Sequence, residues 1–268
     1  MKKNNAFDLK GRTVLLTGAT GWLGQKMAFG LAEAQAHVLV NSRSSAKCLQ
    51  LASAIKRKGL KASPLPFDVT DEEEISKAFA VIKKNFKGLD VLINNAYVPS
   101  AKTLDQSSAR DFRDSYEIAV VAPFLLLQGA LPLLKEAAKK NHGGASVINI
   151  ASMYGSVSPD PSIYEDSKMN NPPYYGAAKA ALIQFTRYAA CHLAPFKIRV
   201  NAISPGPFPS AEARRKYPAF FRALRRKVPL GRVGNPEELQ GAVVFLSSDA
   251  SSFITGVNLP VDGGWTAW

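Results

Sequence analysis

The chain has 268 residues, of which 46% are hydrophobic and 21% charged, and its formal net charge is +13. This is the composition of a globular protein, and the apolar runs are shorter than the roughly 20 residues that a membrane helix needs. The first residues lack the apolar stretch of a secretory signal, and Cys48 and Cys191 provide no framework for disulfides or a metal. We therefore expect a cytoplasmic protein with no metal and no membrane partner.

Short β-branched runs alternate with longer helical patterns along the chain. Strands are expected at 13–18, 37–42, 61–69, 90–96, 146–152, 198–203 and 257–264. Helices are expected at 24–34, 46–58 and 72–85, in a long region ending near residue 140, and at 175–193, 211–228 and 236–249. This alternation is typical of βαβ units, so the sequence predicts an α/β fold with a doubly wound, seven-stranded parallel sheet covered by helices on both faces. No linker or repeat interrupts the pattern, and residues 1–268 are expected to form a single domain.

A glycine-rich loop, TGATGWLG at 17–24, lies between the first expected strand and the first expected helix. Its glycines permit a tight turn and a close approach of backbone to a pyrophosphate, which would sit on the helix N-terminus in a Rossmann-type site. The alternative is a turn that merely needs positive φ. The expected cofactor contacts of this loop are Gly18, Thr20, Gly21, Trp22, Leu23 and Gly24.

The end of the second strand favours NADP(H) as the cofactor. An acid at this position accepts from a free ribose 2′-hydroxyl, whereas an arginine suits a 2′-phosphate. Here the strand is followed by Ser42 and Arg43, with no carboxylate. NADP(H) is therefore the expected cofactor and NAD(H) the alternative, in which Arg43 is a surface residue that stacks on an adenine or points to water.

Ser152, Tyr175 and Lys179 form the expected catalytic group. A lysine four residues after a tyrosine lies on the same helix face, and its positive charge favours the phenolate of a group whose ordinary pKa is about 10. A serine hydroxyl can hold the oxygen of a carbonyl substrate while the tyrosine exchanges its proton and the cofactor moves the hydride. These residues predict an oxidoreductase acting on a secondary alcohol or a ketone.

Several motifs together resemble the short-chain dehydrogenase/reductase family, in the family's order and over nearly the whole chain. They are TGATGWLG (17–24), NNA (94–96), Ser152, YGAAK (175–179), NAISPG (201–206) and TGVNLPVDGG (255–264). Within the family the sequence is similar to single-domain bacterial members of the gluconate 5-dehydrogenase-like and 3-oxoacyl-carrier-protein-reductase-like types. The resemblance implies the fold and the type of reaction, and it leaves the substrate open.

A second tyrosine competes for the catalytic role, because Tyr164 also precedes a lysine, Lys168, by four residues. The family's interval from serine to tyrosine, about a dozen residues, favours Tyr164. However, a helix begun there would meet Pro172 and Pro173, and an interior proline costs roughly 3 kcal/mol. Tyr175 opens a long pattern free of helix breakers. Its interval to Pro205 in the sequence also matches that of the family, so Tyr175 is the predicted acid–base group. Residues 158–173 are then expected to be a loop insertion at the active-site mouth.

The resemblance assigns further positions one by one. Asp68, Val69, Asn94 and Ala96 would contact the adenosine half of the cofactor, and Pro205, Gly206, Phe208 and Ser210 the nicotinamide half. The alternative for Asn94 is a helix or turn cap. Two departures stand out: Tyr97 replaces the family's usual glycine, and Ala119 replaces an asparagine that kinks a helix and holds a water in a proton relay with the lysine.

The substrate side is expected to be covered by a lid at 207–232, with pocket walls from Tyr97, Met153, Tyr154 and Phe208. Within the lid, 211–228 reads as one amphipathic helix with basic outer faces. Its arginines could attract an anionic sugar acid or another oxo acid, or could form a solvated basic face. Elsewhere the basic residues are scattered, so nucleic acid is not an expected partner.

Two functions remain open on the sequence alone. The first is an active NADP(H)-dependent oxidoreductase, and the second is a nucleotide-binding member with impaired catalysis that serves as a regulatory or interaction module. Ala119 supports the second, whereas the intact serine, tyrosine and lysine support the first. The long apolar segments at 120–134 and 175–193 predict a homotetramer, with a dimer as the alternative.

Overall fold

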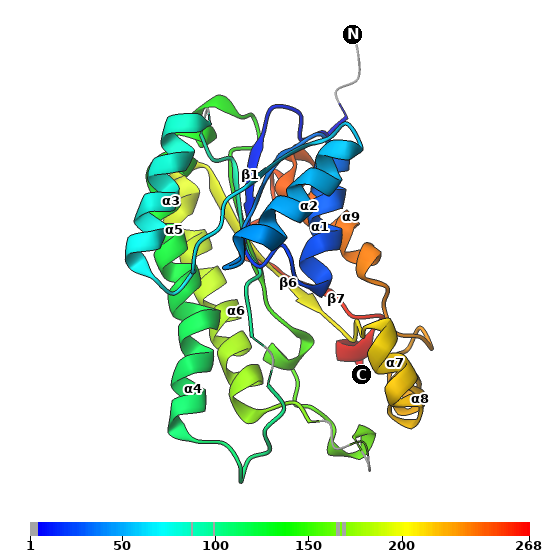
Figure 1. Cartoon of the computed structure of the whole chain (residues 1–268). Helices are drawn as coiled ribbons and strands as arrows, with labels where there is room; N and C mark the ends of the chain where they lie inside the picture. Colours follow the sequence, from blue (N-terminus) through cyan, green and yellow to red (C-terminus); the bar gives the residue numbers. More distant parts are fainter. Residues whose placement is uncertain (1–4, 87, 99, 165–166, 168–169) are drawn as a thin grey trace.

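Seven short parallel strands lie at the centre of the structure, a computed structural model that describes residues 5–86, 88–98, 100–164, 167 and 170–268 (Figure 1). The strands are β1 (Thr13–Leu16), β2 (His37–Val40), β3 (Lys61–Pro64), β4 (Val91–Asn94), β5 (Ala145–Ile150), β6 (Ile198–Pro205) and β7 (Asn258–Val261). They pair in the order β3-β2-β1-β4-β5-β6-β7, and every pairing is parallel. The predicted Rossmann-type sheet is thus confirmed.

Helices cover both faces of this sheet. They are α1 (Trp22–Glu33), α2 (Ser45–Arg57), α3 (Glu72–Asn85), α4 (Ala109–Tyr116), α5 (Ala122–Lys140), α6 (Pro173–Leu193), α7 (Ala211–Lys216), α8 (Pro218–Lys227) and α9 (Leu239–Ser247). Helices α1, α2 and α9 lie on one side, and α3, α5 and α6 on the other (Figure 1). Successive strand residues point to opposite faces, so Val14 and Leu16 pack under the first group of helices and Leu15 under the second.

The long helical region before β5 is interrupted by a π-helical turn, Glu117–Val121, which joins α4 to α5. Over Ala109–Lys140 the combined stretch is long and apolar enough to cross a membrane by length and composition alone, and half of its most apolar window is buried inside the protein. Buried side chains such as Leu126 and Leu134 pack in the same core cluster as β1 and β4. The stretch is therefore a core helix of the fold.

The lid segment differs from the expected single helix at 211–228. The structure has two helices there, α7 and α8, with Tyr217 between them in a non-helical conformation (φ −129°, ψ 62°). Pro218 causes the break, because its ring disfavours a helical conformation in the preceding residue. Pro218 instead begins α8, where a missing backbone N–H costs nothing.

The strand order reverses between β1 and β4. In an open α/β sheet, such a reversal leaves a crevice outside the carboxyl ends of the strands. The glycine-rich loop follows β1 and residues 95–98 follow β4, so both lie at this edge.

Candidate active site

The glycine-rich loop connects β1 to α1 in a conformation that larger residues would not allow. Gly18 has φ +60°, and a Cβ there would lie 2.8 Å from the Cα of Ala96. A Cβ on Gly24 would lie 2.3 Å from the carbonyl oxygen of Gly18. The N-terminus of α1, whose backbone N–H groups suit an anion, therefore stands directly behind a tightly packed loop.

Asn95, which the sequence analysis did not single out, fastens this loop to the end of β4. Its Nδ2 donates to the carbonyl oxygens of Thr17 (2.9 Å) and Gly18 (3.1 Å), and its backbone N–H donates to the Thr17 hydroxyl (2.9 Å). Asn95 also lines both pockets described below. Its position in the middle of the NNA motif could have indicated a role for Asn95 in the site.

The first pocket extends from this loop along the ends of β2, β3 and β4. The predicted cofactor residues that line it are Gly18, Thr20, Gly21, Trp22, Leu23, Gly24, Ser42, Arg43, Asp68, Val69 and Ala96. Arg43 is exposed to solvent, and Asp68 accepts hydrogen bonds from the backbone N–H and the hydroxyl of Thr70. We call this space the nucleotide pocket, because a glycine loop on a helix N-terminus forms its base.

Two predicted cofactor residues do not line either pocket. Asn94 is buried in the sheet, where its Nδ2 donates to Oδ1 of Asn149 (2.8 Å), because the side chain points along the sheet to the neighbouring strand β5. Asn149 in turn donates to the hydroxyl of Thr186 on α6 (2.9 Å). Ser210 accepts from the backbone N–H of Ala213 (3.1 Å) and so caps α7. The cofactor contacts of Asn94 and Ser210 stay predictions.

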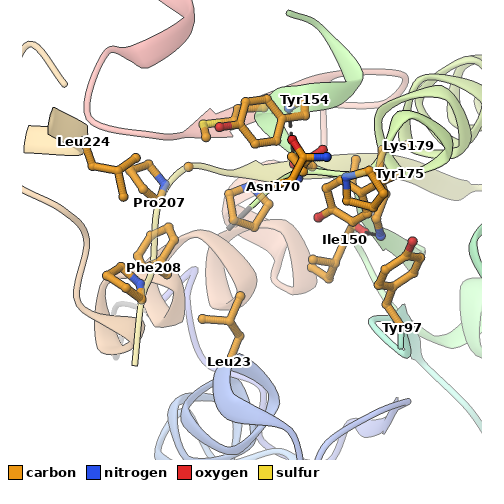
Figure 2. Close-up of a pocket in the computed structure, with 18 of the residues that line it drawn as sticks. Leu23, Tyr97, Ile150, Tyr154, Asn170, Tyr175, Lys179, Pro207, Phe208 and Leu224 are labelled. Carbon is orange, nitrogen blue, oxygen red and sulfur yellow. Dashed lines mark hydrogen bonds between the residues drawn. The ribbon is translucent and has the colours of Figure 1, made fainter. Parts of the chain in front are cut away.

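The second pocket, of about 420 Å³, contains the predicted catalytic group and is called the reaction pocket below. Ser152 follows β5, while Tyr175 and Lys179 lie one turn apart on α6. Pro205, Gly206 and Phe208 line it from the end of β6, and Tyr97, Met153 and Tyr154 complete the expected walls. Figure 2 shows Tyr97, Tyr175, Lys179 and Ile150 together on one side, with Pro207, Phe208 and Leu224 across from them. Leu23, Asn95 and Tyr97 line both pockets, so the two spaces adjoin.

Lys179 is almost completely buried, and its Nζ donates to the carbonyl oxygen of Ile150 (2.7 Å). Burial lowers the pKa of its ammonium group to about 8. On the sequence, Lys179 was predicted to lower the pKa of Tyr175. In the structure, burial raises the pKa of Tyr175, and the hydrogen bond with the Ser152 side chain opposes that rise.

Tyr164 also lines the reaction pocket, but no helix carries it. It follows the short 3₁₀ turn Pro161–Ile163, its hydroxyl lies 3.4 Å from that of Tyr154, and its ring stacks on Phe220 of α8 at 5.5 Å. Helix α6 starts at Pro173, two residues before Tyr175, with proline in the first helical position. Lys168 lies outside the described residues.

The predicted lid segment, 207–232, contributes apolar side chains to the wall of the reaction pocket and no charged ones. Phe220 and Leu224 line the pocket, whereas Lys227 pairs with Asp160 (2.6 Å), Arg232 with Glu238 (2.6 Å), and Arg214 donates to the carbonyl oxygen of Gly234. Among the described lining residues, Lys179 is the one charged side chain. The lid arginines therefore do not form an anion site inside this pocket.

The helix backbone is irregular at Ala119, the position at which the family resemblance implies an asparagine. Ala119 is 2% exposed and belongs to the π-helical turn between α4 and α5. It packs with Val120, Ala178 and the ring of Tyr97. The backbone irregularity therefore does not require the asparagine side chain.

Comparisons with known proteins agree with this geometry. A family model described as enoyl-(acyl carrier protein) reductase matches residues 18–266. The 2-dehydro-3-deoxy-D-gluconate 5-dehydrogenase of Formosa agariphila is 34% identical over 262 residues, which cover 96% of this chain and 94% of that protein.

Two solved structures are also closely similar. A gluconate 5-dehydrogenase from Burkholderia cenocepacia, in complex with NADP and tartrate, has a TM-score of 0.86 and 29% identity, and the match covers 98% of each chain. The Pseudomonas aeruginosa RhlG/NADP active-site complex has a TM-score of 0.87 and 31% identity, with 97% of this chain and 98% of that chain covered.

The fold, the nucleotide pocket and these relatives define an NAD(P)-dependent oxidoreductase. More particularly, the chain belongs to the short-chain dehydrogenase/reductase family.

Proposed function

We propose that this protein uses NADP(H) to interconvert a secondary alcohol and a ketone in the reaction pocket. The observation that carries the proposal is that Ser152, Tyr175 and Lys179 line one pocket, which adjoins the nucleotide pocket at Leu23, Asn95 and Tyr97. When bound, the nicotinamide cofactor supplies or accepts the hydride. Ser152 holds the carbonyl oxygen by a hydrogen bond, and Tyr175 gives its hydroxyl proton to that oxygen during reduction. Lys179 holds the nicotinamide ribose and favours the tyrosinate left behind.

The preference for NADP(H) rests on Arg43 and Ser42, which line the nucleotide pocket without a carboxylate at the end of β2. Both solved relatives described above contain NADP. We expect Arg43→Asp to weaken NADPH binding and to weaken or reverse the preference over NADH, because a carboxylate repels the 2′-phosphate. Titration of both cofactors by fluorescence checks this, with Arg57→Asp on the far end of α2 as a charge-matched control. Tighter binding of NADH by the wild type would contradict the assignment.

The proposed substrate class is a sugar acid or another oxo acid, on the strength of the relatives that are named for gluconate and deoxygluconate chemistry. The pocket wall adds hydroxyl, amide and aromatic groups: Ser152, Tyr154, Tyr164, Asn170 and Asn171. These groups can bind a polyhydroxylated chain by hydrogen bonds. Because Lys179 is the one charged side chain on the described wall, a matched panel must include neutral ketones as well as sugar acids.

The rival function is a nucleotide-binding regulatory or interaction protein with impaired catalysis. Ala119 is the observation in its favour, because it lacks the amide that the family resemblance implies. Reduction of a panel of oxo acids, keto sugars and neutral ketones with NADPH decides between the two functions. Turnover that is lost in Tyr175→Phe supports the oxidoreductase. Tight NADPH binding without turnover on any member of the panel supports the rival.

We also propose that residues 158–173 act as an insertion over the pocket mouth and 207–232 as the lid, within one domain. Their packing supports this, because Tyr164 and Ile163 of the insertion belong to the same apolar cluster as Phe220 and Leu224 of the lid. The proposed assembly is a homotetramer in the cytoplasm. Exposed aromatic side chains on α5 and α6, such as Phe124 and Tyr188, support the assembly.

A further inference from the structure

Tyr97 occupies a position between the nucleotide pocket and the reaction pocket. It lies three residues after the end of β4 and lines both of these pockets, as well as a third space against α4. On the sequence, Tyr97 was predicted only as part of the substrate wall. Its contacts, however, are with the catalytic group.

The ring of Tyr97 faces the buried ammonium of Lys179. Nζ lies 5.0 Å from the centroid of the Tyr97 ring and 5.8 Å from that of Tyr175. The two tyrosine rings meet edge to face, with centroids 5.0 Å apart and an interplanar angle of 67°. A cation within about 6 Å of a ring centroid is attracted by the ring quadrupole, and this attraction is stronger in a site removed from water. Tyr97 therefore contacts both members of the tyrosine–lysine pair.

The place of this ring depends on small neighbours. Tyr97 packs against the cluster of Ala119, Val120 and Ala178, and Ala119 and Ala178 are each 2% exposed. Ala119 and Tyr97 are therefore neighbours in the structure, although their positions differ by 22 in the sequence. The ring packs against the methyl side chain of Ala119, which offers no polar group.

The hydroxyl of Tyr97 is held by a hydrogen bond to the buried side chain of Ser115. Its oxygen lies 3.0 Å from the Ser115 hydroxyl, and Ser115 donates its own proton to the carbonyl oxygen of Tyr174 (3.3 Å). These two hydrogen bonds connect Tyr97, through Ser115, to the start of α6. Burial raises the pKa of Tyr97 to about 12, so its hydroxyl stays neutral at physiological pH. Tyr97 can hold its neighbours through its ring and its neutral hydroxyl.

We propose that Tyr97 is a positioning residue, whose anchored ring holds the Lys179 ammonium and the Tyr175 ring in place. The expected effect on the reaction rate rests on the proposed function. The expected contacts of the Tyr97 ring with Lys179 and Tyr175 do not. The ring, rather than the hydroxyl, makes the contact with the cation. The test is therefore designed to separate the two parts of the side chain.

The kinetic test compares Tyr97→Phe with Tyr97→Leu in single-turnover hydride transfer from bound NADPH. Phenylalanine keeps the ring and removes the hydrogen bond to Ser115, whereas leucine keeps an apolar wall and removes the ring. We expect Tyr97→Phe to stay close to wild type and Tyr97→Leu to lose on the order of tenfold or more in rate, in keeping with a buried cation–π contact. Tyr116→Leu, at an exposed tyrosine that lines none of the three pockets, is the matched control. Thermal unfolding of each variant excludes loss of fold as the cause.

A residue that only lines the substrate pocket would behave differently. In that case Tyr97→Leu would raise KM and leave the rate at saturation unchanged, which would overturn the inference. An equal loss of rate in Tyr97→Phe and Tyr97→Leu would also overturn it, because the hydroxyl rather than the ring would then carry the effect.

A spectroscopic readout keeps the inference testable even in a protein without turnover. In protein labelled with ¹³Cε-lysine, the Lys179 signal is assigned by its absence in Lys179→Met. We expect ring currents to shift its εCH₂ protons upfield in wild type and Tyr97→Phe, and the shift to fall in Tyr97→Leu. An unchanged signal in Tyr97→Leu would overturn the positioning role. Absent turnover by the wild type, with this shift present, would instead count against the proposed function alone.

Discussion

Tyr164 and Tyr175 both line the reaction pocket, so location alone does not tell which one exchanges a proton. Their supports differ. Tyr175 lies in the first turn of α6, one turn before Lys179, whereas Tyr164 follows a 3₁₀ turn and leans on the lid. A helix keeps an acid–base group at a fixed distance from the cofactor, and a loop residue that packs on a lid moves with that lid.

We expect Tyr175→Phe to lower single-turnover hydride transfer by about 10² or more, in keeping with the worth of a positioned general acid, and to leave NADPH affinity nearly unchanged. Tyr164→Phe should retain the chemical step and change at most the apparent substrate affinity. Lys179→Met should damage both turnover and cofactor binding. Stopped-flow absorbance with NADPH at saturation measures these rates. A rate abolished in Tyr164→Phe and preserved in Tyr175→Phe would reverse the assignment.

The buried lysine also predicts a pH dependence of stability. Burial lowers the pKa of Lys179 from 10.5 to about 8, so between these values the unfolded chain binds more protons than the native protein. Stability from this residue therefore rises as pH increases through that interval. We expect the free energy of unfolding of wild type, relative to Lys179→Met, to rise by roughly 3 kcal/mol between pH 8 and 10.5. Denaturant unfolding at several pH values measures the difference, and a flat difference would contradict it.

Residue chemistry was predictable where the chain itself limits the choice. Two prolines before Tyr175 were sufficient to select the tyrosine that lies in a long helix. The structure has that helix at Pro173–Leu193, so it begins two residues before the predicted start at 175. The roles of Asn94 and Asn95 were not predictable in this way. The two residues are adjacent and chemically identical, and only the pleat of β4 decides that one faces Asn149 and the other the glycine loop.

At the scale of elements, Ile163 and Tyr164 of the proposed insertion pack in one apolar cluster with residues of the proposed lid. Phe220 of α8 is 7% exposed, stacks on Tyr164 and meets Phe221 edge to face. Lys227 of the same helix pairs with Asp160 of the insertion, but both side chains are partly exposed, and solvent screens such a pair. Apolar packing therefore holds this cover together.

We expect Phe220→Ala to loosen the cover, because truncation of a buried phenylalanine typically costs about 3–5 kcal/mol. The substrate KM should rise about tenfold, while single-turnover hydride transfer at saturating substrate stays close to wild type. Limited proteolysis should cut the lid faster in the variant. Phe196→Ala, at a half-exposed ring that lines neither pocket, is the control. An unchanged KM together with unchanged proteolysis would show that the lid does not depend on this contact.

The split of the lid into α7 and α8 could have been predicted from Pro218 alone, since the residue before a proline avoids the helical conformation. The amphipathic pattern of 211–228 concealed the break, because Phe221 and Leu224 keep helical spacing within α8. The pairing of Lys227 with Asp160 was not predictable, because 67 residues separate them in the sequence. Long-range contacts of this kind arise only when the sheet brings the two segments to the same edge.

At the scale of the whole molecule, β–α alternation was sufficient to predict the sheet. The outer face of α5 and α6 is the surface through which we expect the protein to assemble. Phe124 of α5 packs near Phe185 of α6 with ring centroids 6.3 Å apart, and Phe124 is 46% and Tyr188 59% exposed. We expect a homotetramer at micromolar concentration, measured by light scattering. Phe124→Glu combined with Tyr188→Glu should shift the protein to a smaller species, because charges placed in an apolar interface are costly. A wild-type monomer would contradict the proposed assembly.

The buried bonds from Asn94 to Asn149 and from Asn149 to Thr186 bear on how mutations in this chain are to be interpreted. Thr186 also donates to the carbonyl oxygen of Leu182, so the chain of bonds ends on α6, about three turns beyond Tyr175. The sheet interior is therefore hydrogen-bonded to the helix that carries Tyr175 and Lys179. A substitution at Asn94 would imitate an active-site defect in a screen for lost activity, although its side chain lines neither pocket.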